Sequence, residues 1–192
     1  MKVAALFVDH QGTYSEVPWV DLWDEERDAR RYPGELPVVA HPPCSRWCQL
    51  AHINQKRYGH RVGDDGGCFA SALASVRRWG GVLEHPAFSY AWPHFGLTRP
   101  LRGGWQRSID GGWVAQVSQR AYGHRARKMT WLYYVGKRPP LETSWTCPEP
   151  EAQVSWCQNH GNSPLPRISK RSAAATPEQF RDLLLALAAN AA

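Results

Sequence analysis

The chain has 192 residues and a formal net charge of +6, from 23 Lys and Arg residues against 17 Asp and Glu residues. This length is typical of one domain with a full hydrophobic core. No apolar run approaches the ~18 residues of a membrane-spanning helix and no secretory leader is evident, so we expect no membrane association. Five scattered cysteines favour a reduced, cytoplasmic protein over a disulfide framework. The positive charge favours a polyanionic partner, with nucleic acid as the first candidate.

The first half of the chain alternates short apolar runs with one clear helical pattern. Apolar and small residues recur at helical spacing from Gly66 to Trp79, with Asp64 or Asp65 available as a cap. An alternation of strand, helix and strand predicts a parallel sheet with right-handed crossovers. The expected strands are Val3–Val8, Val17–Trp23, Leu36–Ala40 and Val82–Glu84, with a short exposed helix over Asp24–Arg31 and an irregular segment over Ser45–Asp65.

The second half contains two later strands and a terminal helix. We expect the strands over Gly112–Val117 and Thr130–Val135. The helix should begin after Thr176 as N-cap and Pro177, and end near Ala189. We therefore predict a single compact α/β domain over residues 1–192, with irregular Pro- and Gly-rich insertions at about 86–112 and 139–166.

Two of the expected strands end at residues that can carry chemistry. One strand runs into Pro42, Pro43 and Cys44, and the two prolines force a stiff exit that presents the thiol. The strand before Pro86 ends at Glu84 in the same way. Open α/β folds place their ligands at the carboxyl ends of strands, so a thiol nucleophile and an acid at one edge indicate an enzyme. The plainer alternatives are an inert buried cysteine and an ion-pairing carboxylate at a strand end.

Four segments, in order, resemble motifs of the cytosine-5 DNA methyltransferases, in particular the short phage-type members. The segment HPPC resembles the family's catalytic Pro-Cys motif, and GGVLEHP resembles the strand that ends in its catalytic Glu. The segment QRAYGHRARKMTWLYYVG resembles a Gln- and Arg-bearing motif before a late strand, and KRSAAATPEQFRDLLLALA resembles the closing segment. Together they span roughly Leu36 to Ala188, and their shared order carries the resemblance.

This resemblance implies a compact, Rossmann-like, mostly parallel sheet of the methyltransferase type, which acts on DNA. Cys44 would add to carbon 6 of a pyrimidine, and Glu84 would protonate or hydrogen-bond ring nitrogen 3. Arg125 or Arg127 would hold the base or its phosphate. The base would be flipped out of a duplex or taken from a single strand. The implied nucleic-acid contacts are Arg46, Trp47, Gln119, Arg120 and Lys128.

The family also implies S-adenosylmethionine as cofactor, bound at a glycine-rich turn after the first strand. Here that turn contains one glycine, Gly12. The acidic residue that would hold the ribose is Asp21 or Asp24. The implied cofactor contacts are Phe7, Asp9, Gly12, Asp21 and Pro42.

Three alternatives start from the same residues. A pyrimidine-modifying enzyme could use Cys44 without S-adenosylmethionine. A degenerate methyltransferase fold could instead serve as a non-catalytic DNA-binding or anti-restriction protein. Thiols and imidazoles could also hold zinc, although their spacing matches no common zinc signature and we assign no metal ligand. The zinc candidates are Cys44, Cys48 and His52, with His41, Cys68 and His85 nearby.

Overall fold

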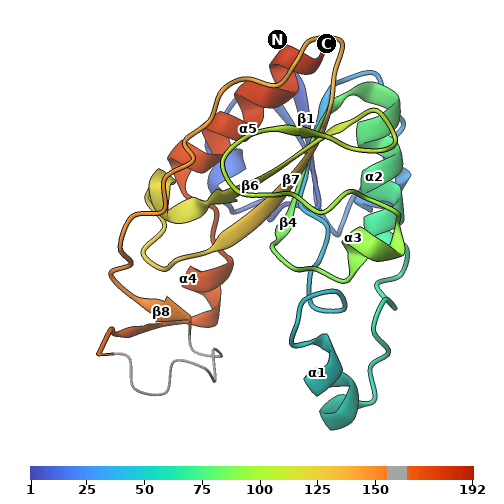
Figure 1. Ribbon diagram of the computed structural model, residues 1–192. Helices are drawn as coiled ribbons and strands as arrows, with labels where there is room; N and C mark the ends of the chain where they lie inside the picture. Colours follow the sequence, from blue (N-terminus) through green and yellow to red (C-terminus); the bar gives the residue numbers. More distant parts are fainter. Residues whose placement is uncertain (155–163) are drawn as a thin grey trace.

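A seven-stranded sheet forms the centre of the computed structural model, which describes residues 1–154 and 164–192 (Figure 1). Its strands lie in the order β2-β1-β3-β4-β7-β6-β5. The short strands β8 and β9 form a separate pair. The strands are β1 Val3–Leu6, β2 Val20–Trp23, β3 Val38–Ala40, β4 Gly81–Pro86, β5 Gln106–Arg107, β6 Trp113–Ser118, β7 Met129–Val135, β8 Gln153–Val154 and β9 Arg167–Ile168.

The sheet is mixed, so the α/β class is confirmed but the prediction of a mostly parallel sheet is wrong. Strands β2, β1, β3 and β4 run parallel, as expected. The longer ladders, β4 with β7 and β7 with β6, are antiparallel, as is β6 with β5. The link between β6 and β7 covers only residues 119–128 and contains the 3-10 helix η3 (Gln119–Tyr122). That link is shorter than the dozen or more residues of a parallel crossover, which favours an antiparallel return.

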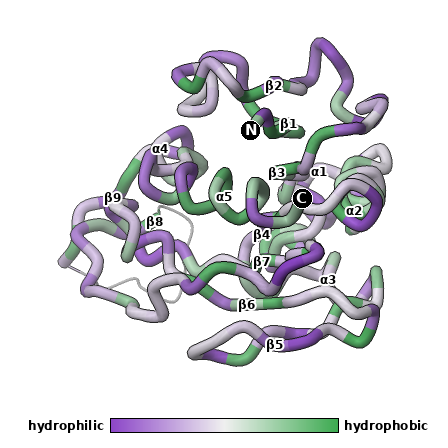
Figure 2. Tube along the Cα trace, turned by 90° about the horizontal axis from the view of Figure 1, so that it is seen from above, coloured by the Kyte–Doolittle hydropathy of each residue, from purple (hydrophilic) through white to green (hydrophobic). Residues whose placement is uncertain are grey.

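One helix covers each face of the sheet, because alternate strand residues are apolar on both faces (Figures 1 and 2). Helix α2 (Cys68–Trp79) buries Phe69 and Val76 in a core that includes Leu83 of β4. Helix α5 (Glu178–Ala191) packs on the other face, in a second core that includes Val82 of β4. The neighbouring residues Val82 and Leu83 therefore anchor opposite layers.

Helix starts differ slightly from the expected positions. Gly67 is the N-cap of α2, but the Asp65 carboxylate accepts hydrogen bonds from the backbone N–H groups of Gly67 (3.0 Å) and Phe69 (2.8 Å). Helix α5 begins at Glu178 with Pro177 at its cap, one residue later than the expected Thr176 cap. The charged stretch after β2 forms only the 3-10 helix η2 (Ala29–Arg31), because Asp28 before it adopts a left-handed conformation (φ 52°).

Short elements occupy segments that were expected to be irregular. Helix α1 (Ala51–Tyr58) lies between β3 and α2, and α3 (Ala91–His94) lies with β5 inside the first insertion. Strands β8 and β9 and helix α4 (Lys170–Ala174) follow the antiparallel half. The 3-10 helix η1 (Thr13–Glu16) joins β1 to β2. The part 155–163 of the second expected insertion lies outside the described residues.

Both chain ends lie at one end of the molecule, and α1, α3 and α4 lie at the opposite end (Figure 1). That opposite end is where the parallel strands reach their carboxyl termini. Within the described residues, no helix has the length and apolar character needed to cross a membrane.

The close approach of β3 and β4 requires glycine at position 81. Gly81 has φ +122°, and a Cβ built there would lie 1.9 Å from the Val38 carbonyl oxygen. We expect Gly81→Ala to lower the free energy of unfolding by about 2–5 kcal/mol, from backbone strain and overpacking together. Gly59→Ala is the matched control, because Gly59 has φ +70° but nothing within 4 Å of the built Cβ. It should cost about 1 kcal/mol. Equal losses in urea denaturation would contradict this account.

Candidate active site

The candidate site begins where β3 and β4 end side by side. Ala40 pairs with Leu83 in parallel register, so the next residues, His41 and Glu84, emerge next to each other. Because strand side chains alternate, both point to the α5 face of the sheet, where Tyr14 also lies. Strand register thus brings together two side chains that are 43 positions apart in the sequence.

Glu84 is a buried carboxylate with a hydrogen-bond partner on each oxygen. His41 Nδ1 lies 3.0 Å from Oε2, and Gln119 Nε2 donates to Oε1 at 2.9 Å. Burial alone would raise the pKa of Glu84, but the His41 hydrogen bond and the positive charge of Lys128 lower it to about 2. Glu84 is therefore a carboxylate at neutral pH, and it can accept hydrogen bonds from a ligand without donating one.

His41 connects Glu84 to a buried tyrosine. The Tyr14 hydroxyl lies 2.8 Å from His41 Nε2. With Nδ1 donating to Glu84, a neutral His41 ring accepts the Tyr14 proton at Nε2. Burial, followed by the negative charge of Glu84, raises the pKa of Tyr14 well above its usual value, so this residue stays a donor. Tyr14, His41 and Glu84 form one hydrogen-bonded chain.

The sequence suggested that Gln119 lies on an exposed nucleic-acid surface. The structure instead places Gln119 in this hydrogen-bonded chain. It is fully buried, and its Nε2 group donates to both Glu84 and Thr130 Oγ1 (3.0 Å). Its Oε1 atom is also buried and has no hydrogen-bond partner among the described residues. A buried acceptor without a partner favours a ligand that brings an N–H or O–H donor.

Cys44 lies at the same edge of the sheet and is half-buried. Burial, the neighbouring Cys48 and the negative charge of Glu84 raise the pKa of its thiol to about 11, and Lys128 opposes this shift. The charges of Glu84 and Lys128 therefore act on this thiol in opposite directions. In the free protein, Cys44 is a protonated thiol at neutral pH.

The arginines expected at the reaction centre contact other residues. Arg125 Nε lies 3.9 Å from Glu151, and Arg127 Nη2 lies 3.3 Å from Glu149. Arg120, expected to contact nucleic acid, donates to the Glu149 carbonyl oxygen (2.8 Å) and to the Glu151 carboxylate (2.7 Å). These three arginines tether the segment before β8. The cation that acts on Cys44 and Glu84 is Lys128, which the sequence had assigned to nucleic-acid contact.

Trp47 is buried, so its ring is not available to stack on a base. Its indole N–H donates to Asp65 at 2.7 Å, and its ring packs against Phe69 and Phe95. Neighbouring Arg46 is partly exposed and stays a candidate for nucleic-acid contact. Trp47 instead fixes the loop after Cys44 to the start of α2.

A cavity of roughly 880 Å³ lies at the carboxyl ends of β1, β2 and β3. Strands β2 and β3 lie on opposite sides of β1, so the strand order reverses at this point. Open α/β sheets bind their ligands at such a reversal. Five acidic residues line it, and Arg30, which also lines it, is paired with one of them, Asp28. The acidic residues are Asp9, Asp24, Glu25, Glu26 and Asp28.

This cavity contains two of the five expected cofactor contacts, Phe7 and Asp9. Asp24 lines it, whereas the Asp21 carboxylate accepts from Trp23 Nε1 (2.8 Å) and pairs with Arg27 (2.8 Å). Buried Pro42 does not line it, but the next residue, Pro43, does. Gly12 is also outside the lining. Its backbone N–H donates to the Asp9 carbonyl oxygen (2.9 Å) in the turn after β1.

The zinc alternative has no support in the residues that the structure describes. No group of three or more His, Cys, Asp or Glu side chains there could hold a metal ion. His85, one of its candidates, points to the α2 face of the sheet and is fully buried between Phe69 and Trp92. Burial lowers the pKa of His85 to about 4, so its ring is neutral.

Two site residues were not identified from the sequence. Tyr14 is in η1, in a segment without a motif, and His41 had been considered only as a metal ligand. A signal for His41 was available, since in paired parallel strands the residue that follows Ala40 lies beside the residue that follows Leu83. No such signal exists for Tyr14.

No protein-family model matches this chain, and no curated protein matches it either. The interpretation of the site therefore depends on its geometry and on the chemistry of its residues.

Glu84 should make the acid stability of the protein depend on its charge. Because its folded-state pKa of about 2 is below the ordinary 4.5, the carboxylate adds stability above pH 4.5 that is lost as the pH falls toward 2. Between pH 5 and pH 3, wild type should lose about 1–2 kcal/mol more unfolding free energy than Glu84→Gln. Glu142→Gln, at an exposed carboxylate, should follow wild type in the same denaturation series. Parallel curves for all three would refute a buried, charged Glu84.

Proposed function

We propose that this protein is a cytosine-5 DNA methyltransferase-like enzyme that modifies a pyrimidine through a covalent adduct with Cys44. The observation that carries the proposal is that β3 leads into Cys44 and the neighbouring β4 ends at Glu84, a charged and hydrogen-bonded carboxylate whose negative charge acts on the Cys44 thiol. Addition at carbon 6 requires a nucleophile and a proton for ring nitrogen 3, where the negative charge would otherwise collect, and a carboxyl group at the same sheet edge can share that proton. The order of the four sequence motifs supports the same assignment.

Cys44 supplies the covalent step. The Cys44 thiol loses its proton, which ring nitrogen 3 takes up, and its sulfur bonds to carbon 6 of the ring. The C5–C6 double bond breaks, and carbon 5 becomes the nucleophilic carbon. Carbon 5 then attacks a one-carbon electrophile. Loss of the carbon 5 proton restores the double bond and releases the thiolate. Lys128 assists the first step, because its positive charge favours the thiolate over the thiol.

Glu84 and Gln119 recognise the base. Cytosine carries an amino group next to ring nitrogen 3, and the Glu84 carboxylate and the unpartnered Gln119 Oε1 are two acceptors for its N–H donors. The proton that the Cys44 thiol gives up can pass through the Glu84 carboxyl to ring nitrogen 3 of the adduct, and the His41 hydrogen bond holds that carboxyl in place. Uracil and thymine have a carbonyl oxygen in place of the amino group, so the two acceptors favour cytosine.

The acidic cavity fits S-adenosylmethionine as the donor. This cofactor carries a sulfonium, an ammonium and two ribose hydroxyls, which complement a carboxylate-rich lining, whereas a nucleoside polyphosphate would be repelled. Asp24 follows β2 directly and is mostly buried, so it is the residue for the ribose hydroxyls. When bound, the cofactor would supply an electrophilic methyl group. Pro43, next to Cys44, lines the same cavity.

Trapping on DNA that contains 5-fluorocytosine tests the covalent step. Fluorine at carbon 5 cannot leave as a proton does, so the Cys44 adduct should persist once a methyl group is added. With S-adenosylmethionine present, wild type should form a denaturation-stable protein–DNA adduct, and Cys44→Ser should lose it completely. Cys48→Ser, at a half-buried thiol four residues away, is the matched control and should retain it. Wild type without any adduct would favour the non-catalytic DNA-binding alternative.

Calorimetry tests the donor. Wild type should bind S-adenosylmethionine, and Asp24→Asn should bind it about 10- to 100-fold more weakly, because a hydrogen bond to a charged group is lost. Asp21→Asn is the control, since Asp21 contacts Trp23 and Arg27 and does not line the cavity. No heat from wild type at millimolar cofactor would rule out this donor. An adduct formed with another one-carbon donor would then support the alternative enzyme.

A further inference from the structure

A second cavity, of roughly 380 Å³, lies at the carboxyl edge where β6 ends and β7 begins. Its strand residues Gln116 and Met129 point to the α2 face of the sheet, opposite to Glu84. Two of its lining residues, Ser118 and Met129, directly neighbour Gln119 and Thr130 in the sequence. Gln119 donates hydrogen bonds to both Thr130 and Glu84. None of the residues expected from the sequence to bind cofactor lines it. Its volume is within the range of sites for small organic groups. It is lined by Phe88, Arg102, Gly103, Gln116, Ser118, Arg127, Met129, Trp145, Thr146 and Cys147.

Phe88 is an exposed aromatic ring on a strained backbone. It follows β4 by two residues and has φ 63°, a left-handed conformation that is costly for a bulky side chain. The hydrogen bond from the Ala87 N–H to the Met129 carbonyl oxygen (2.9 Å) holds this turn against β7. Phe88 is nevertheless 40% exposed. A strained backbone that leaves part of an apolar ring in solvent suggests a binding role for that exposed part.

Phe88 also has the surroundings of a stacking platform. Its ring packs against Trp131 (5.3 Å between centroids), and the Arg99 guanidinium lies 5.0 Å from its centroid. Aromatic rings next to arginine are the usual platform for unpaired nucleobases, because every base has a π-face.

The charges and polar groups of this cavity fit a nucleotide. Arg99 and Arg102 have no ion-pair partner within the described part of the chain, unlike Arg120, Arg125 and Arg127. Trp131 Nε1 donates to Gln116 Oε1 (2.9 Å), which fixes the amide and leaves its NH₂ group as a donor toward a ligand. A planar ring with acceptor atoms and an attached phosphate complements this set.

We propose that this cavity is a subsite for the nucleotide next to the modified pyrimidine, with its base stacked on Phe88 and its phosphate near Arg102. The inference rests on the proposed function for the identity of the ligand. It adds that the substrate is a strand and not a free nucleotide, because a free nucleotide has no second base to occupy the subsite. It also assigns a role in substrate binding to Phe88, which no sequence motif indicated.

Binding of two probes tests the subsite. The first is a DNA trinucleotide with central cytosine and 2-aminopurine beside it, and the second is deoxycytidine monophosphate. Phe88→Leu should weaken trinucleotide binding about 5- to 100-fold and abolish the quenching of 2-aminopurine fluorescence. Its affinity for the monophosphate should stay within about twofold of wild type. Phe88→Tyr, which keeps the ring, should restore both trinucleotide signals.

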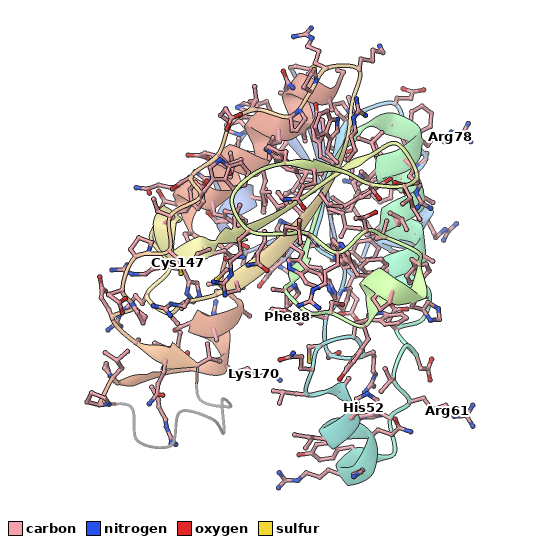
Figure 3. All side chains as sticks on the ribbon, in the orientation of Figure 1. His52, Arg61, Arg78, Phe88, Cys147 and Lys170 are labelled. Atoms are coloured by element: carbon pink, nitrogen blue, oxygen red, sulfur yellow. The ribbon has the colours of Figure 1, made fainter. Side chains whose placement is uncertain are left out.

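Matched controls separate a local effect from a general one. Trp19 is 42% exposed and does not line the cavity, so Trp19→Ala should bind both probes as wild type does. Arg102→Ala should weaken binding of the trinucleotide and reduce the salt dependence of that binding. Arg78→Ala, far from Phe88 in Figure 3, should change neither. Equal urea midpoints for Phe88→Leu and wild type exclude a folding defect.

Three outcomes would overturn or separate the two proposals. The subsite fails if Phe88→Leu and Trp19→Ala behave alike, or if wild type binds the trinucleotide no tighter than the monophosphate. If the Cys44 adduct forms but Phe88 has no effect, the proposed function stands without the subsite. If strand binding depends on Phe88 and no adduct forms under any condition, the subsite stands and the covalent chemistry fails.

Discussion

The buried negative charge of Glu84 is the constraint on which the carboxyl edge of the sheet depends. A carboxylate removed from water costs several kcal/mol unless hydrogen bonds and opposite charge compensate it. His41, Gln119 and Lys128 provide that compensation, from the ends of three different strands or their links. Removal of one partner leaves an uncompensated buried charge, so the positions of these strands relative to one another are tied to the ionisation of a single side chain.

This constraint explains why the mixed sheet matters for the site. The parallel half delivers Cys44, His41 and Glu84, whereas Gln119 and Lys128 come from the link between β6 and β7. An edge formed by parallel strands alone would hold the Cys44 thiol and the Glu84 carboxylate without the Gln119 amide, which donates a hydrogen bond to Glu84, and without Lys128, whose charge lowers both pKa values. The antiparallel return of β7 against β4 supplies both.

The sequence predicted the parts of this edge that depend on local pattern. Apolar runs that stop at prolines located Cys44 and Glu84, and helical periodicity located α2. It could not predict the direction in which each later strand runs or the face of the sheet toward which a side chain points. Whether Gln119 points inward or Arg125 pairs with Glu151 depends on contacts between distant segments. Whether Asp21 or Asp24 lines the cavity depends on a turn after β2. The residue types at these positions are compatible with either arrangement of the side chains.

In the proposed reaction, the charge states of Cys44 and Glu84 couple recognition of the base to activation of the thiol. With a pKa of about 11, the Cys44 thiol is protonated at neutral pH in the free protein. The negative charge of Glu84 is one cause of that high pKa. A base that donates N–H groups or a positive charge to Glu84 offsets this repulsion, while Lys128 continues to favour the thiolate. The nucleophile then becomes reactive where a matching base is already bound.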